Sequence, residues 1–215
     1  ADVNVTGTVR VLETARREGA GAFVLASSCA VYGDHQPPLR ESAPARPLSP
    51  YAASKLAGEA FTCAAAQAGL PALSLRFFNV YGAGQDAHSP YAAALPAFAA
   101  AAAAGRPARL FGDGLQERDL IHVDDVVRAL LLALDAPSSA RGRAFNVGTG
   151  VATTMLDLAR KVGARLGSAP APVHEPERPG DLRFSRADVT LAREVLGFEA
   201  RIRLDDGLAR TLTSR

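Results

Sequence analysis

One stretch of the chain contains three residues whose side chains could transfer a proton and whose spacing could bring them together: Ser28, Tyr51 and Lys55. Ser27-Ser28-Cys29 follows the apolar run 22–26, so a serine hydroxyl is expected at the end of a strand. Tyr51 and Lys55 are four residues apart and share one face of a helix, one turn apart. A tyrosine has an ordinary pKa of about 10, and a neighbouring ammonium group favours the phenolate. The stretch is therefore predicted to act on a hydroxyl group, whereas the same pair standing alone would indicate only an exposed helical turn.

The elements that must position these residues follow from the surrounding pattern. Ser49 and Pro50 are typical of a helix start, and a helix is predicted from Tyr51 to Ala68. An amphipathic helix is predicted over 4–17, with buried strands at 23–26 and 73–77. This alternation indicates a parallel α/β sheet. The remaining predicted helices are 92–104, 124–134 capped by Asp124, 155–166 capped by Thr153 or Thr154, 187–196 and 204–212, and the remaining predicted strands are 109–111, 119–123, 144–147 and one at Val173.

Composition narrows the class of protein. The 215 residues are 48% hydrophobic and 21% charged, which is typical of a globular protein that can bury a sizeable core. The net charge of +2 and the absence of a basic face argue against a nucleic-acid partner. The most apolar window, 91–105, is too short to span a membrane. Cys29 and Cys63 have no metal-ligand spacing, Cys63 is expected in the core, and a reducing, cytoplasmic location is expected.

A series of short motifs then resembles a known family along the whole chain. In order, the motifs are Asn4-Val-Thr-Gly-Thr8, Ser27-Ser28 before Val31-Tyr-Gly33, Tyr51-x-x-x-Lys55, Arg76-Phe-Phe-Asn79-Val-Tyr-Gly82, Gly112-Asp-Gly114 with Arg118-Asp119 and His122-Val123, Asn146-Val-Gly-Thr-Gly150, and Arg178-Pro-Gly-Asp181. The chain resembles the extended short-chain dehydrogenase/reductases, in particular the nucleotide-sugar 4-epimerases. One Tyr-x-x-x-Lys pair is weak evidence, but seven landmarks in order are specific.

The resemblance implies a doubly wound parallel α/β (Rossmann) sheet with a smaller α/β substrate-binding domain. Residues 1–82 and 121–149 would form the NAD-binding part, and residues 83–120 and 150–215 the substrate-binding part. Such proteins usually begin with a strand, a glycine-rich phosphate turn and a helix, and no such turn occurs here. About a hundred residues of a usual unit are missing by this comparison. The sequence is therefore expected to represent the C-terminal half of the sheet.

The resemblance also assigns roles at the cofactor end of the site. Tyr51 would be the general base, Lys55 would tune it and bond the nicotinamide ribose of NAD, and Ser28 would hold the same substrate oxygen. Asn4 and Phe78 match positions that touch the cofactor. Asn4 could equally be a helix N-cap.

At the substrate end, the resemblance places arginines on a diphosphate, which suits their planar fork of donors. Ser185 matches a position where a bulky aromatic residue excludes N-acetylated sugars in some epimerases, so its small side chain predicts that they are accepted. The residues assigned to a UDP-sugar, besides Ser28 and Tyr51, are Asn79 near the phosphate, Arg118 and Arg178 on the diphosphate, Asp181 on the ribose, Ala93, Ala94 and Phe111 at the uracil, and Ser185 at the sugar.

Cys29 and Ala30 indicate which reaction is expected. The related 4,6-dehydratases place Asp and Glu at these two positions to eliminate water, and neither residue present here can replace them readily. NAD-dependent epimerisation at C4 of a UDP-hexose, through a 4-keto sugar, is the leading hypothesis. The alternatives are another reaction of the family, such as UDP-glucuronate decarboxylation, 4,6-dehydration or reduction, and an inactive nucleotide-sugar-binding fragment. Helices 4–17 and 51–68 are expected to form a homodimer, and no metal is expected.

Overall fold

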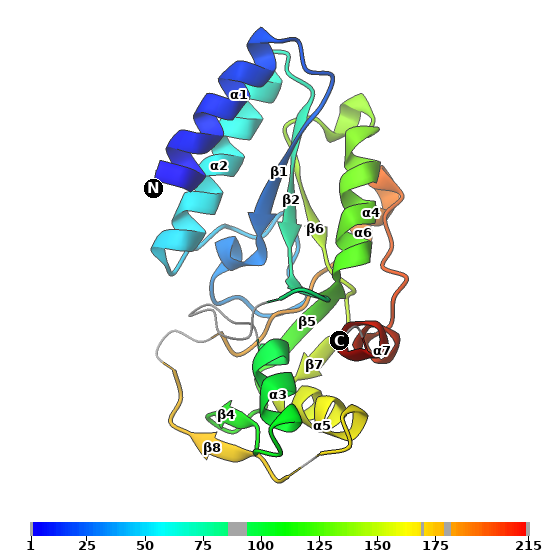
Figure 1. Cartoon of the computed structure of the whole chain (residues 1–215). Coiled ribbons are helices and arrows are strands. Elements are labelled where there is room, and N and C mark those ends of the chain that lie inside the picture. The colour runs from blue at the N-terminus through cyan, green and yellow to red at the C-terminus, as the bar shows by residue number, and fades with distance from the viewer. Residues whose placement is uncertain (1, 86–93, 169, 179–181, 214–215) are drawn as a thin grey trace.

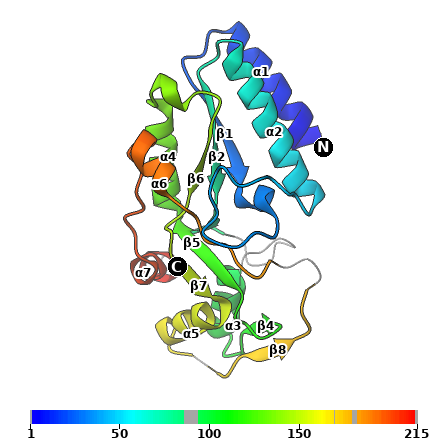
Figure 2. The ribbon, with the colours of Figure 1, turned by 180° about the vertical axis from the view of Figure 1, so that it is seen from behind.

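The computed structural model describes residues 2–85, 94–168, 170–178 and 182–213. A parallel sheet of three strands lies between two layers of helices (Figures 1 and 2). Its strand order is β1-β2-β6, from Phe23–Ser28, Ala72–Phe77 and Ala144–Val147. Helices α1 and α2 cover one face, and α4 and α6 cover the other. This arrangement confirms the predicted α/β class with a parallel sheet.

The second part of the molecule lies beyond the carboxyl ends of these strands. Strand β5 pairs with β3 in parallel and with β7 in antiparallel, and β4 pairs in parallel with β8. Helices α3, α5 and α7 pack beside these strands (Figure 1). The bounds are β3 Asn79–Tyr81, β4 Arg109–Phe111, β5 Glu117–His122, β7 Ala152–Thr154 and β8 Val173–Glu175 for the strands, and α1 Thr8–Arg17, α2 Pro50–Gln67, α3 Ala94–Ala103, α4 Val123–Leu134, α5 Met155–Arg165, α6 Thr190–Leu196 and α7 Leu204–Thr213 for the helices, with a π-helical turn at Asp2–Gly7 and 3₁₀ turns at Cys29–Tyr32 and Ser138–Ala140.

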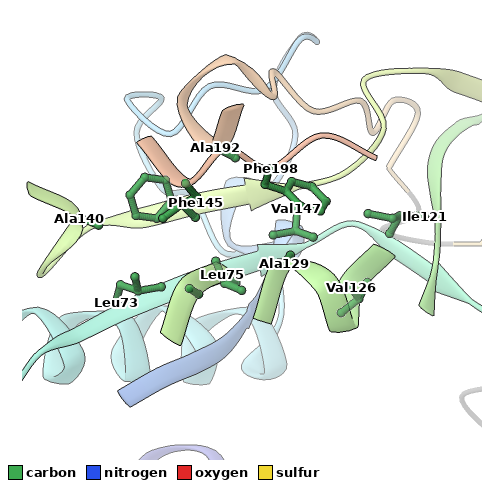
Figure 3. Close-up of a cluster of buried hydrophobic side chains, with 12 residues drawn as sticks. Leu73, Leu75, Ile121, Val126, Ala129, Ala140, Phe145, Val147, Ala192 and Phe198 are labelled. Atoms are coloured by element: carbon green, nitrogen blue, oxygen red, sulfur yellow. The ribbon is translucent and has the colours of Figure 1, made fainter. Parts of the chain in front are cut away.

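Each part is organised around buried apolar side chains. Leu73 and Leu75 of β2 and Phe145 and Val147 of β6 lie in the core between the sheet and α4 and α6 (Figure 3). A separate cluster in the second part contains Leu110, Leu158 and Val162. Strand β2 is buried along nearly its whole length, as is usual for a strand inside a parallel sheet, although it includes the polar residues Ser74 and Arg76. The fold thus places the carboxyl ends of β1 and β2 next to the second part.

Most of the predicted elements are confirmed, with shifts of a few residues at their ends. Strand β1 continues to Ser28, so both serines belong to the strand itself. Helix α6 begins only at Thr190, because Ala187 forms a bridge with Leu39. The short strands β3 and β7 were not predicted.

Two local predictions are wrong. Asp124 does not cap α4, because His122 is the N-cap residue and its Nδ1 accepts from the Asp124 N–H at 3.2 Å. Asp124 instead lies in the first turn, where its charge favours the helix dipole. Cys63 is exposed rather than in the core.

Among the described residues, no helix is both long and apolar enough to cross a membrane.

Candidate active site

Helix α2 carries Tyr51 and Lys55 to the carboxyl edge of the sheet, where β1 ends at Ser28. The Ser49 hydroxyl accepts from the Ala52 N–H at 3.1 Å and starts the helix, with Pro50 in its first turn. The Lys55 ammonium donates to the Ala26 carbonyl of β1 at 2.8 Å. This bond fixes α2 against β1, so Tyr51, one turn nearer the helix start, lies toward the end of the strand.

The Lys55 ammonium lies 5.8 Å from the centre of the Tyr51 ring. Burial disfavours the charged form and lowers the pKa of Lys55. Tyr51 is 51% exposed, so a ligand can reach this residue. The Ser28 hydroxyl accepts from the Ala30 N–H at 3.2 Å and caps the short turn that follows. The three residues therefore offer a phenol, an ammonium and a hydroxyl at one edge of the sheet.

Asn4 and Phe78, predicted to touch a cofactor, lie at this same edge. The Asn4 amide donates to the Ser54 hydroxyl at 3.0 Å, and that hydroxyl donates to the Tyr51 carbonyl at 2.7 Å. The alternative that Asn4 caps a helix does not hold, because it lies inside the π-helical turn and the N-cap of α1 is Gly7. Phe78 is buried, with its ring centre 6.5 Å from that of Tyr32.

Five of the residues assigned to the substrate line one pocket. The pocket has a volume of about 230 Å³ and is formed by β3, α3, β4 and β5. The Arg178 guanidinium lies 3.7 Å from the centre of the Phe111 ring. Arg118 is oriented by a bond from its Nη1 to the Leu182 carbonyl at 2.7 Å. The predicted residues that line the pocket are Asn79, Ala94, Phe111, Arg118 and Arg178. Ala93 and Asp181 lie outside the described residues.

Ser185 lies between this pocket and the Ser28 end of the site. Its hydroxyl accepts from the Asn79 amide at 3.4 Å and lies 4.0 Å from the Cys29 sulfur. Burial raises the pKa of Cys29 to about 11, so its thiol stays protonated at neutral pH. Ser185 is itself buried. A sugar between Ser28 and Asn79 would therefore meet two small, uncharged side chains.

The sequence did not reveal two buried carboxylates that organise the site. Asp119 accepts hydrogen bonds from Thr149, Gly150 and Ala187, at distances from 2.7 to 3.1 Å. It thereby joins the loop after β6 to β5. Both segments were recognised as separate motifs, but nothing in the sequence indicated that they pair. Glu59 is the second buried carboxylate. The one sign of it in the sequence was its position four residues after Lys55, which places both on the same face of the predicted helix.

The residues fit the nicotinamide end of NAD. The Lys55 ammonium and the Tyr51 hydroxyl are donors at the carboxyl ends of parallel strands, which is where doubly wound sheets bind nucleotides. No glycine-rich turn for a pyrophosphate occurs in the sequence, so these residues provide only that end. No group of three or more His, Cys, Asp or Glu side chains suited to a metal occurs in the described part of the chain.

A parallel sheet between helices, with a serine at a strand end and a Tyr-x-x-x-Lys pair on the next helix, defines an extended short-chain dehydrogenase/reductase. The sequence model described as the NAD dependent epimerase/dehydratase family matches residues 1–148, and the chain belongs to that family.

Three similar proteins give this membership a more detailed context. The UDP-glucose 4-epimerase of Mycolicibacterium smegmatis is 42% identical over 215 residues, covering 99% of this chain and 68% of that protein. The crystal structure of the Thermotoga maritima UDP-glucose 4-epimerase with UDP-glucose has a TM-score of 0.93 at 35% identity, covering 98% of this chain and 68% of the other. MoeE5, in complex with UDP-glucuronic acid and NAD, has a TM-score of 0.88 at 38% identity, covering 97% of this chain and 69% of the other. The chain thus spans about two thirds of the length of each.

Proposed function

We propose that the protein catalyses NAD-dependent epimerisation at C4 of a UDP-hexose, interconverting UDP-glucose and UDP-galactose and accepting the N-acetylated forms. One observation carries the proposal. The Ser28, Tyr51 and Lys55 edge is joined through Cys29, Ser185 and Asn79 to a pocket that holds Arg118 and Arg178. A sugar at the first end and its diphosphate at the second match the order of groups in a nucleotide sugar.

In this mechanism, the Tyr51 oxygen accepts the proton of the sugar 4-hydroxyl, and Ser28 holds the same oxygen by a hydrogen bond. The Lys55 ammonium stabilises the phenolate by its positive charge. Arg118 and Arg178 hold the diphosphate, so the sugar can turn over while the nucleotide stays bound. Bound NAD would supply the acceptor and donor of the C4 hydride. Tyr51 returns the proton to O4 when the 4-keto sugar is reduced.

Cys29 and Ala30 favour epimerisation over the other reactions of the family. Elimination of water needs an acid and a base beside the sugar. Cys29 cannot serve as the base near neutral pH because its pKa is about 11, and Ala30 has no titratable group. A 4,6-dehydratase would therefore lack the acid and the base that elimination needs. A decarboxylase that uses a glutamate at the position of Ala30 would lack that carboxylate.

A homodimer is supported by the outer face of α1 and α2, which lie side by side (Figure 2). Phe61 is exposed there and lines a groove of about 250 Å³ that is formed by both helices. Glu13 and Arg16 line the same groove, so a two-fold axis can set the carboxylate of one copy against the guanidinium of the other.

A cytoplasmic location is supported by the two free thiols. We further propose that residues 1–82 and 121–149 hold the cofactor, and that residues 83–120 and 150–215 hold the substrate.

Proton NMR of the anomeric region tests the proposed reaction. The protein, loaded with NAD, is incubated with UDP-galactose, and separately with UDP-glucuronate and dTDP-glucose. We expect the UDP-glucose anomeric signal to grow until it stops changing, with the other two substrates unaltered. A UDP-pentose or a 4-keto-6-deoxy sugar, without interconversion of the hexoses, would reject the proposal in favour of decarboxylation or dehydration.

A further inference from the structure

Five buried polar side chains form a connected network beneath the candidate active site: Ser27, Glu59, Arg76, Tyr32 and Asn146. The Arg76 guanidinium lies 4.7 Å from the centre of the Tyr32 ring, and the Tyr32 hydroxyl donates to Asn146 Oδ1 at 2.6 Å. The network joins β1, α2, β2 and β6, and each member is less than 10% exposed.

Glu59 is the only member on α2, and it is bonded to two strands at once. The Ser27 hydroxyl of β1 donates to Glu59 Oε1 at 2.5 Å. Arg76 of β2 donates through Nε to Oε1 at 3.0 Å and through Nη2 to Oε2 at 2.7 Å. A bidentate pair of this kind fixes both distance and orientation. Ion pairs as buried as this one often add little net stability, so we attribute its presence to the geometry that it fixes.

The bonds of Glu59 fall next to every residue of the proposed proton site. Ser27 directly precedes Ser28, and Glu59 follows Lys55 by one helical turn and Tyr51 by two. We propose that Glu59 is a positioning residue, which sets the axial and rotational position of α2 so that Tyr51 and Lys55 face Ser28. It acts through Ser27 and Arg76 without touching the substrate. The inference rests on the proposed function.

The bonds from Glu59 to Ser27 and Arg76, here called the Glu59 clamp, would matter because proton transfer needs precise geometry. Proton transfer requires the base within about 3 Å of the oxygen it serves. A displacement of about 1 Å in a catalytic group can cost on the order of 100-fold in rate. The diphosphate residues lie on other elements, so a shift of α2 should alter turnover and leave nucleotide binding unchanged.

Two variants loosen the clamp, and a third is the control. Ser27→Ala removes one bond and keeps the ion pair, whereas Glu59→Asp keeps the charge on a side chain shorter by one methylene. Thr62→Val is the control, because Thr62 is also buried on α2 and its hydroxyl donates to the Gly58 carbonyl of the same helix at 2.8 Å. We expect kcat to fall about 10-fold in Ser27→Ala and about 100-fold in Glu59→Asp. KM for the UDP-sugar should stay within twofold of the unmodified protein in all three variants.

A readout that does not need turnover separates this inference from the proposed function. The ¹³Cζ resonance of Tyr51, assigned with Tyr51→Phe, senses its distance from the Lys55 ammonium. We expect it to move in Ser27→Ala and Glu59→Asp and to stay in place in Thr62→Val. An unmoved resonance, or kcat values equal to that of Thr62→Val, would show that Glu59 has only a structural role. Absent epimerisation by the unmodified protein, together with a moved resonance, would reject the proposed function and retain the positioning role.

Discussion

Lys55 and Tyr51 differ in how the fold holds them, and the difference suits their proposed roles. The Lys55 ammonium is anchored on the Ala26 carbonyl, so its charge stands at a fixed place near the phenol. The Tyr51 ring is half exposed and free to meet a substrate hydroxyl. A fixed cation beside an accessible phenol is a better general base than two mobile side chains, because its charge is already in position.

Ser185 should set the tolerance for N-acetylated sugars. Its small side chain lies between Cys29 and Asn79, where a tyrosine would fill the space of an acetamido group. We expect Ser185→Tyr to lower kcat/KM for UDP-N-acetylglucosamine about 100-fold more than for UDP-glucose.

Ser185→Ala is the matched control, because it removes the hydroxyl without adding volume. It should reduce turnover of both sugars alike. Equal losses on both sugars in Ser185→Tyr would show that volume at this position does not select the substrate.

The two cysteines should react very differently. Cys63 is exposed, whereas burial raises the pKa of Cys29 to about 11. Only the thiolate is alkylated, so iodoacetamide at pH 8 should modify one thiol rapidly, and the slow reaction of the other should accelerate as the pH rises towards 11. Mass spectrometry of the labelled peptides measures both rates. A rapid thiol that persists in Cys63→Ala would contradict this assignment.

At the level of the elements, close packing of α7 on β3 joins the C-terminal helix to the second part of the fold. A Cβ atom on Gly207 would lie 2.0 Å from the Tyr81 hydroxyl oxygen. Gly207→Ala should therefore lower the free energy of unfolding by about 1–3 kcal/mol, as measured by urea denaturation.

Gly7→Ala is the control, since a Cβ there meets only the Asp2 carbonyl at 3.5 Å. Tyr81→Phe should relieve part of the cost, because the Tyr81 hydroxyl has no hydrogen-bond partner among the described residues. Additive effects of Gly207→Ala and Tyr81→Phe would contradict the proposed contact.

The helices and strands show how far the sequence could predict the fold. Helix α2 was predicted to within a residue at each end, because Ser49-Pro50 and Gly69 mark its ends by local chemistry. Strands β3 and β7 are three residues long and exist only through pairing with β5, which no local pattern encodes. His122 caps α4 in a role that Ser, Thr, Asp or Asn fills more often.

The sequence likewise predicted one part of the candidate site and missed another. The spacing of Tyr51 and Lys55 was visible as a helical face, and the motifs around Arg118 and Arg178 were recognised by resemblance. The Glu59 clamp and the Asp119 hub were not foreseen, because each joins segments at least 17 residues apart in the chain. Such contacts are set by tertiary packing rather than by local sequence.

At the scale of the whole molecule, the proposed homodimer is the property most open to test. Phe61→Glu places a charge in the groove of α1 and α2, so analytical ultracentrifugation should show a shift from dimer to monomer. Val127→Glu is the control, because Val127 is similarly exposed but lies on α4, across the sheet. Dissociation by Val127→Glu alone would place the interface on α4 instead.

In the proposed epimerisation of a UDP-hexose, Tyr51 accepts and returns the proton of the sugar 4-hydroxyl. The most direct test is the rate constant for conversion of UDP-galactose to UDP-glucose by Tyr51→Phe, with NAD present, relative to the unmodified protein. The exposed ring is retained, so folding and UDP affinity should not change. We predict a loss of about 10²–10⁴-fold in that rate constant. A Tyr51→Phe protein that interconverts the two sugars at the unmodified rate would show that Tyr51 does not handle this proton.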